Sequence, residues 1–282
     1  MNTHMTDTQT RKLQRGILWI VLMLFTCFWV APFIFLVFTS FKSPGELFSR
    51  SVFAPPTSLR WSNYIGAWKT GNIGRVMWNS LLVTIKVPIG ILFSSMAAFF
   101  FARFHYRFQK LLFLFMIGGT MIAPQVLLAP LFRLLLKLGL INSLFGVMMV
   151  YIGFGVPYGI FILTGFFKTI PVELEEAARI DGASHFNIYW NVILPLAKPA
   201  LAAIFIIDFV GTWNEFGMAL VILQKQKVWT VPLAFQSYIS AYQNDYGQLT
   251  AAITMTILPV LLVYALFQRH FVSGIARGAL KG

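Results

Sequence analysis

Long apolar runs separated by shorter polar stretches dominate this sequence. Each of six runs is long enough to cross the roughly 30 Å of hydrocarbon in a bilayer as a single helix. Several contain proline, which a helix inside a bundle tolerates when neighbouring helices satisfy the freed carbonyls. The pattern predicts an all-α, polytopic membrane protein with about six kinked transmembrane helices, at Ile17–Phe41, Val76–Phe101, Leu111–Leu131, Ser143–Phe167, Ala200–Leu223 and Leu249–Phe267.

The polar stretches divide the chain into a tail at 1–16, a transmembrane domain at 17–267 and a second tail at 268–282. An even number of spans places both tails on the same side of the membrane. Arg103, Arg107 and Lys110 crowd the short stretch 102–110, and short loops rich in such residues stay in the cytoplasm. Both termini are therefore expected in the cytoplasm, with loops 42–75 and 224–248 outside and loop 168–199 inside.

Composition supports the membrane assignment and excludes other classes. Hydrophobic residues make up 58% of the chain and charged residues 11%, whereas soluble proteins carry about 25% charged residues. The net charge of +13 falls mostly between apolar runs, which favours contact with membrane lipid headgroups and argues against nucleic acid. The first run is too long for a cleaved signal peptide and lacks a small-residue cleavage site.

The stretch 168–199 is too polar to span the membrane and too regular to be a slack linker. Pro171 suits the first turn of a helix, and the glutamates that follow favour the positive end of the helix dipole. We expect that helix to end near Ile180, because Asp181-Gly182 is a break signal. A second short helix should run from Ala183 to about Asn191, before Leu194-Pro195 ends it. The prediction is a helix–turn–helix elbow.

The surface of this elbow suits contact with another protein. Ala177 and Ala178 are short enough to let a partner approach closely, and Glu175 and Glu176 offer it charge. The alternative is a loop that merely joins two spans. The residues by themselves leave both readings open.

Five further side chains raise functional hypotheses because they are polar or aromatic within predicted spans. A charge at membrane depth costs at least about 2.5–3.5 kcal/mol on insertion scales. In one reading, these residues line a water-filled path through the membrane. In the other, Lys86 pairs with Asp208 to hold helices together, and Glu215 lies near the external interface. The candidates are Lys86, Asp208, Trp213, Asn214 and Glu215.

Catalysis and metal binding find little support in the sequence. The four histidines are scattered and form no metal-ligand spacing. No G-x-x-x-x-G-K-[ST] phosphate loop is present, so the chain cannot hold ATP by that route. We expect no enzyme activity, no metal and no cofactor in this chain.

Several motifs together resemble the smaller, six-span permease of the carbohydrate (maltose-type) ABC importers. The elbow contains the EAA pattern of that family, with Glu176-Ala177-Ala178, then Gly182, then Leu194-Pro195, although Val192 stands where isoleucine is common. Asp181-Gly182-Ala183 is similar to the form found in carbohydrate importers. Further similarities lie at Asn79-Ser80, at Trp213-Asn214-Glu215 and in the ending Gly278-Ala279-Leu280-Lys281-Gly282.

The resemblance implies an ABC importer type I permease fold in the inner membrane, forming half of a sugar translocation path. In that path Trp213 would stack on a sugar ring and Asn214 would bond its hydroxyls. Its implied partners are an ABC ATPase dimer that binds ATP and Mg, a second homologous permease and an extracytoplasmic sugar-binding protein. Glu176 would meet a basic residue of the ATPase, and the C-terminal tail would reach between the ATPases. The implied coupling residues are Glu175, Glu176, Ala177, Ala178, Asp181, Gly182, Leu194 and Pro195, and the tail residues are Gly278, Lys281 and Gly282.

Two alternatives remain at this stage. An importer of amino acids, phosphate or peptides is close, but the Asp-Gly-Ala form is less common there. An ion-coupled secondary transporter would use Lys86, Asp208 and Glu215 as a relay. Such folds usually contain two related halves, and no internal repeat is evident in this chain.

Overall fold

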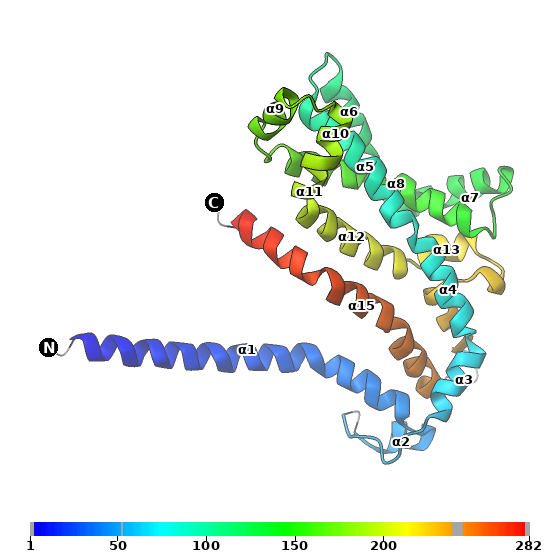
Figure 1. The fold of residues 1–282 in the computed structure, drawn as a ribbon. Coiled ribbons are helices and arrows are strands. Elements are labelled where there is room, and N and C mark those ends of the chain that lie inside the picture. The colour runs from blue at the N-terminus through cyan, green and yellow to red at the C-terminus, as the bar shows by residue number, and fades with distance from the viewer. Residues whose placement is uncertain (1–2, 52, 239–244, 280–282) are drawn as a thin grey trace. The chain divides into compact units, whose positions relative to one another are not determined.

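The computed structural model describes residues 3–51, 53–238 and 245–279, and these form helices and turns without any strand (Figure 1). They fall into two compact units, which are treated separately here. Unit 1 comprises Met1–Gly71 with Ser237–Met255, and unit 2 comprises Asn72–Gln236 with Thr256–Gly282. The all-α prediction is confirmed.

Unit 1 is built from α1 (Thr3–Phe41), α2 (Pro44–Ser49), α3 (Ser62–Thr70) and the start of α15 (Tyr246–Ala279). Helix α1 includes most of the predicted tail 1–16, so the tail and the first predicted span form one continuous helix. Asn63 Nδ2 donates to the carbonyls of Ser40 and Lys42, each at 2.9 Å, and thereby joins α3 to the end of α1.

The 42–75 stretch contains the short helices α2 and α3, and α2 is capped at its N-terminus. Ser43 and Glu46 form a capping box around the N-terminus of α2. Hydrogen bonds from the Ser43 backbone N–H and then from Thr57 lower the pKa of Glu46 to about 2. The carboxylate therefore stays ionised and the cap intact well below neutral pH.

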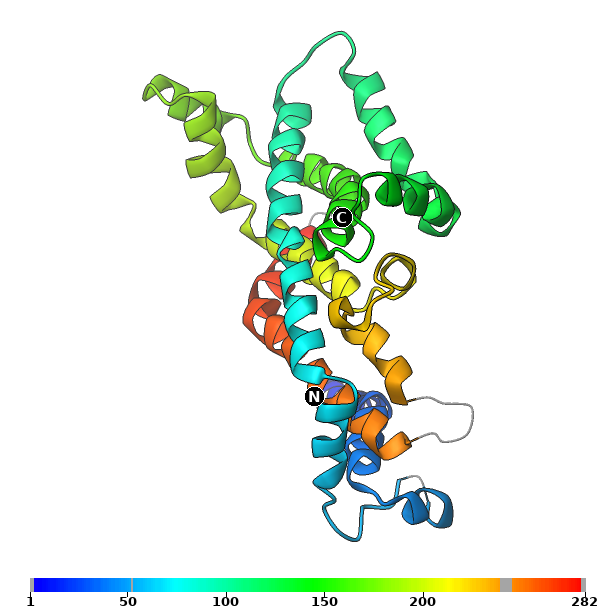
Figure 2. The same ribbon diagram turned by 90° about the vertical axis from the view of Figure 1, so that its right-hand side faces the viewer.

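Unit 2 is organised around α5 (Lys86–Arg103) and α8 (Leu144–Phe167), which lie side by side (Figures 1 and 2). Helices α4 (Ile73–Thr84) and α12 (Lys198–Trp213) also pack against α8. One apolar cluster forms at the Phe167 end of α8, around Leu163 and Ile193. A second forms near its other end, around Val147 and Ala219.

The third predicted span is bent rather than continuous. Helix α6 (Gln109–Gly118) and a 3₁₀ turn lead to Met121, and a second arm runs from Pro124 through α7 (Leu128–Lys137) at 85° to the first. Pro124 has no N–H to donate and so favours a break at this point. Helix α7 carries Arg133 and Lys137 one turn apart on an otherwise apolar sequence.

The fifth predicted span, Ala200–Leu223, is wrong as a continuous helix. Helix α12 ends at Trp213, and a separate short helix, α13, covers Gly217–Ile222. The chain continues through a 3₁₀ turn at Gln226–Val228, α14 (Val231–Ala234) and a 3₁₀ turn at Phe235–Tyr238.

The number of spans agrees with the prediction. Four described helices are long and apolar enough to cross a membrane, and two bent pairs bring the number to as many as six. The four are Gln14–Phe41, Ile73–Arg103, Leu144–Phe167 and Tyr246–Gln268.

Candidate coupling elbow and polar pocket

The predicted elbow forms between α8 and α12. Helix α9 covers Glu173–Ile180, and the chain reverses at Gly182, whose φ is +81°. The Gly182 N–H donates to the Arg179 carbonyl at 3.0 Å, and the Ala183 N–H donates to the Ala178 carbonyl at 2.9 Å. This closure satisfies carbonyls at the end of α9 in the manner of a glycine C-cap.

Gly182 is required for its backbone angle and not for space, because an added Cβ would meet nothing within 4 Å. A residue with a side chain at positive φ costs about 1–2 kcal/mol. We therefore expect Gly182→Ala to destabilise the turn and Gly182→Asn to be better tolerated, because asparagine adopts left-handed angles more readily. Limited proteolysis of the elbow measures the difference, and equal cleavage of the two variants would contradict this account. Gly165→Ala, at an exposed position with open space near the C-terminal end of α8, is the matched control.

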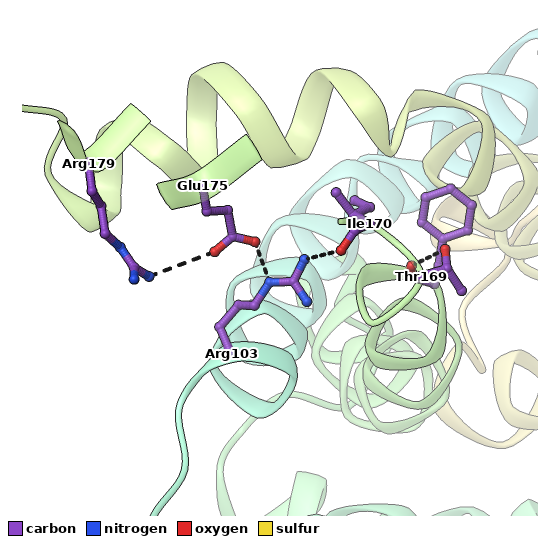
Figure 3. A network of polar contacts seen from close by, with 6 residues as sticks. Arg103, Thr169, Ile170, Glu175 and Arg179 are labelled. Carbon is purple, nitrogen blue, oxygen red and sulfur yellow. Dashed lines mark hydrogen bonds and ion pairs between the residues drawn. The ribbon is translucent and has the colours of Figure 1, made fainter. Parts of the chain in front are cut away.

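The side chain of Glu175 does not lie on the surface, which corrects the expectation that it offers charge to a partner. It is fully buried and forms an ion pair with Arg103 at the end of α5 (Figure 3). Arg103 Nη2 also donates to the Ile170 carbonyl at 2.9 Å, and Arg179 Nη2 lies 3.9 Å from the second carboxylate oxygen of Glu175. Glu175 therefore fastens α9 to the membrane-spanning helices.

The second arm of the elbow also differs from the prediction, because Leu194-Pro195 does not end it. Helix α10 (His185–Ile188) continues through a π-helical turn at Tyr189–Ile193 into α11 (Leu194–Leu196), and the 74° bend to α12 falls at Ala197. The Leu194 N–H donates to the Tyr189 carbonyl, five residues back. This wider turn accommodates Pro195, whose ring would clash with a carbonyl of a regular α-helix.

The second arm has its own polar contact with α5. The hydroxyl groups of Tyr189 and Ser95 share a buried hydrogen bond of 2.7 Å. Ile188 and Ile193 lie on the same arm and pack into the apolar cluster that contains Phe167. The elbow is thus held to α5 at both of its arms.

The remaining surface of α9 is exposed. Glu176, Ala177 and Asp181 are accessible, and Ile180 is 87% exposed at the tip. Its side chain is thus almost entirely accessible, at the end of the helix that carries Glu176. The elbow therefore combines a fixed base with a free tip that carries both an apolar and an acidic side chain.

A polar pocket of about 420 Å³ lies farther along the same helices. Lys86 of α5 forms an ion pair with Asp208 of α12 at its edge, as one of the two readings anticipated. A Cβ at Gly155 of α8 would lie 3.4 Å from Lys86 Nζ, so the glycine leaves room for the pair. The lining residues are Lys86, Pro124, Gln125, Tyr151, Phe154, Gly155, Tyr158, Asp208, Gly211, Thr212, Glu215 and Met218.

Glu215 lines this pocket without being on the helix that carries Asp208. Its carboxylate accepts hydrogen bonds from the Tyr151 hydroxyl and from the N–H groups of Met218 and Ala219, the last two at 2.8 and 3.0 Å. It therefore caps the N-terminus of α13. The same side chain explains why the predicted fifth span divides at this point.

Trp213 and Asn214 do not have the places that the sugar-stacking hypothesis required. Trp213 is 2% exposed, its Nε1 donates to the Thr256 carbonyl at 3.2 Å, and its ring stacks on Phe209. An indole whose N–H and face are both engaged is a packing residue. Asn214 is exposed at the end of α12 and does not line the pocket.

Other predicted and overlooked residues can now be placed. Gly278 lies in α15, whereas Lys281 and Gly282 lie outside the described residues. Arg103 and Tyr151 were overlooked as site residues, since Arg103 was treated only as a topology signal. The sequence did offer one indication of the ion pair, because Arg103 lies at the end of a span and the elbow carries several glutamates that could face it. In the described part of the chain, no three His, Cys, Asp or Glu side chains gather as a metal site.

Comparisons with known proteins agree with this geometry. Residues 90–277 match the family described as binding-protein-dependent transport system inner membrane component. The diacetylchitobiose uptake system permease protein of Streptomyces coelicolor is 35% identical over 264 residues, which cover 93% of this chain and 87% of that protein. The melibiose/raffinose/stachyose import permease protein of Bacillus subtilis is 33% identical over 258 residues, covering 91% and 93%.

A solved structure shares the fold. A bacterial ABC transporter involved in the import of the acidic polysaccharide alginate has a chain that matches with a TM-score of 0.76 at 24% identity. The match covers 93% of this chain and 98% of that one. None of these comparisons supports an ion-coupled secondary transporter.

Proposed function

The chain belongs to the family of binding-protein-dependent transport system inner membrane components, and from that premise we propose how it works in sugar import. Members of this family are permease components of ABC importers, and they are not catalytic. The named relatives carry oligosaccharides, so a sugar is the proposed substrate. ATP and Mg are bound by a separate ATPase dimer.

The elbow is the proposed contact with that ATPase. Its exposed tip offers Ile180 for an apolar cleft and Glu176 for a basic residue, while Ala177 and Ala178 allow close approach. Gly182 and Asp181 shape the turn, and Glu175, Leu194 and Pro195 position the elbow from inside. The observation that carries this proposal is the combination of a free tip and a base fastened to α5 through Glu175 and Arg103.

The length of α8 supports placing its two ends on opposite sides of the membrane. Its 24 residues rise about 36 Å, enough to cross the hydrocarbon. The elbow adjoins the Phe167 end, so on this proposal the Leu144 end faces outwards. Both termini are then cytoplasmic, and the C-terminal tail at Gly278, Lys281 and Gly282 approaches the ATPases in the inner membrane assembly.

The pocket beside Lys86 and Asp208 is the proposed contribution of this chain to the sugar path. Glu215 and Tyr158 add hydrogen-bonding groups and an exposed aromatic ring to its lining. Trp213 is excluded from this role by its packing. A second, homologous permease would supply the other half of the path, and an extracytoplasmic sugar-binding protein would deliver the substrate.

Two substitutions at the tip test the coupling proposal. We expect Ile180→Asp to weaken ATPase binding about 30-fold, since an apolar anchor at the centre of an interface contributes about 2 kcal/mol or more. Glu176→Gln should weaken it less and flatten its salt dependence. Co-elution of the ATPase from detergent, measured at two salt concentrations, gives both values.

Lys168→Gln is the matched control, because it changes one exposed charge at the base of the elbow. It should leave the ATPase bound. An ATPase that stayed at the wild-type level with Ile180→Asp would refute the tip as the contact. The absence of any co-eluting ATPase from the wild-type complex would refute the importer assignment itself.

A further inference from the structure

Four consecutive polar residues, Gln224–Lys227, follow α13 at the end of unit 2 opposite the elbow. We call this segment the QKQK run. All four side chains are exposed. The run lies in a short irregular connection between α13 and α14, where an exposed segment would ordinarily have few fixed contacts.

Side chains of neighbouring elements nevertheless hold its backbone in place. Asn142 Oδ1 accepts from the Lys225 N–H at 2.7 Å. Asn79 Nδ2 donates to the carbonyls of Lys227 and Trp229, at 3.1 and 2.9 Å. Asn79 is only 7% exposed, so these bonds are largely shielded from competing water. The run is thereby pre-organised.

Ser80 extends this anchoring to the residues that follow. Its hydroxyl oxygen accepts from the Val231 N–H at 2.9 Å, and the side chain is 3% exposed. The Asn79-Ser80 pair was noted in the sequence without an assigned role. In the structure, the pair fixes both the end of the QKQK run and the start of α14.

The charge at this end of unit 2 is uniformly positive. Lys225 and Lys227 are accompanied by exposed Arg75, Arg133 and Lys137, and none of the five forms an ion pair within the described residues. Of the two carboxylates that line the pocket in unit 2, Glu215 is engaged by Tyr151 and two backbone N–H groups and Asp208 by Lys86. An approaching acidic surface would therefore meet exposed positive charge.

The chemistry of the run indicates a partner in water and not the lipid surface. Segments that lie in the membrane interface carry an apolar face beside their basic residues. Helix α7 has that character, because exposed Leu134, Leu136 and Leu138 alternate with its cations. The QKQK run has no apolar side chain at all, so burial in lipid would gain it nothing.

We propose that the QKQK run is a docking surface for a carboxylate-bearing face of the extracytoplasmic sugar-binding protein, held ready by Asn79 and Ser80. This inference rests on the proposed function and names the chemistry of one of its partners. Opposite charges at the edge of an interface chiefly accelerate association. A fixed backbone reduces the ordering cost of each encounter.

The test measures association of the sugar-loaded binding protein with the complete transporter in nanodiscs. Replacing both lysines by glutamate (Lys225→Glu with Lys227→Glu) should slow association about tenfold or more at 50 mM salt, with the difference shrinking near 1 M, where the screening length is about 3 Å. Replacing both by glutamine should give an intermediate rate. Lys110→Glu, at an exposed lysine in the first turn of α6, should have no effect.

Two further measurements separate the possible failures. ATPase co-elution and basal ATP hydrolysis should stay at the wild-type level in every variant, because the elbow is unchanged. If the wild-type complex itself showed neither, the proposed function would be refuted and not the docking surface. Association rates that are equal in the wild type and in the double glutamate variant would overturn the docking surface. A second result would also overturn it: a lysine variant that associates normally with the binding protein but loses co-purified phosphatidylglycerol, measured by mass spectrometry. The QKQK run would then bind lipid.

Discussion

Glu175→Gln is expected to release the elbow from α5 and to abolish coupled sugar uptake. The substitution keeps the volume of the side chain but removes the charge that faces Arg103, whose side chain is only 7% exposed. Breaking a buried ion pair by neutralising one partner costs about 3–5 kcal/mol. A loss of about 3 kcal/mol reduces the anchored population by roughly a hundredfold. Limited proteolysis at Arg179 reports the release, and uptake reports its consequence.

Two matched variants give this experiment its meaning. Glu176→Gln removes the neighbouring exposed charge and should leave the proteolysis pattern unchanged. Replacing both members of the pair (Arg103→Met with Glu175→Met) should restore much of the protection, because apolar residues of similar size can substitute for a buried pair. Normal uptake and protection in Glu175→Gln would show that the pair does not anchor the elbow.

The second large effect is expected at the ion pair between α5 and α12. Asp208→Asn leaves Lys86 charged without its partner inside the span. Insertion scales put such a charge at about 2.5–3.5 kcal/mol. We expect lower thermal stability of the purified complex and loss of uptake, with the ATPase still co-eluting. Differential scanning fluorimetry and uptake measure the two effects.

A charge swap separates attachment from transport. Exchanging the two residues (Lys86→Asp with Asp208→Lys) should recover stability if pairing alone matters. Recovered stability with uptake still absent would support a direct role of the pocket in the sugar path. A stable, fully active Asp208→Asn protein would show that neither role is needed.

Periodic features of the fold were accessible from the sequence. The apolar runs predicted the span count, and Gly182 predicted the turn of the elbow, because a positive φ is a local requirement. Kinks at the prolines were predicted, but the 85° size of the bend near Pro124 was not. The break at Glu215 was not predicted, because it depends on interactions with other elements, such as the Tyr151 hydroxyl on the Glu215 carboxylate, which hydropathy does not register.

The site shows the same division between local and long-range information. Glu175 and Glu176 are adjacent and chemically identical, yet successive residues of a helix point about 100° apart. Only the position of Arg103 decides which glutamate faces inwards. Likewise, an indole inside a span suits either a sugar or a packed core, and the Thr256 carbonyl decides the case of Trp213.

The three polar links on α5 have a mechanical consequence. The covalent route from the elbow to α12 passes through a widened π turn and a 74° bend. Arg103, Ser95 and Lys86 connect the elbow and α12 to α5, a continuous hydrogen-bonded helix. On the coupling proposal, a displacement at α9 would reach the wall of the pocket through α5.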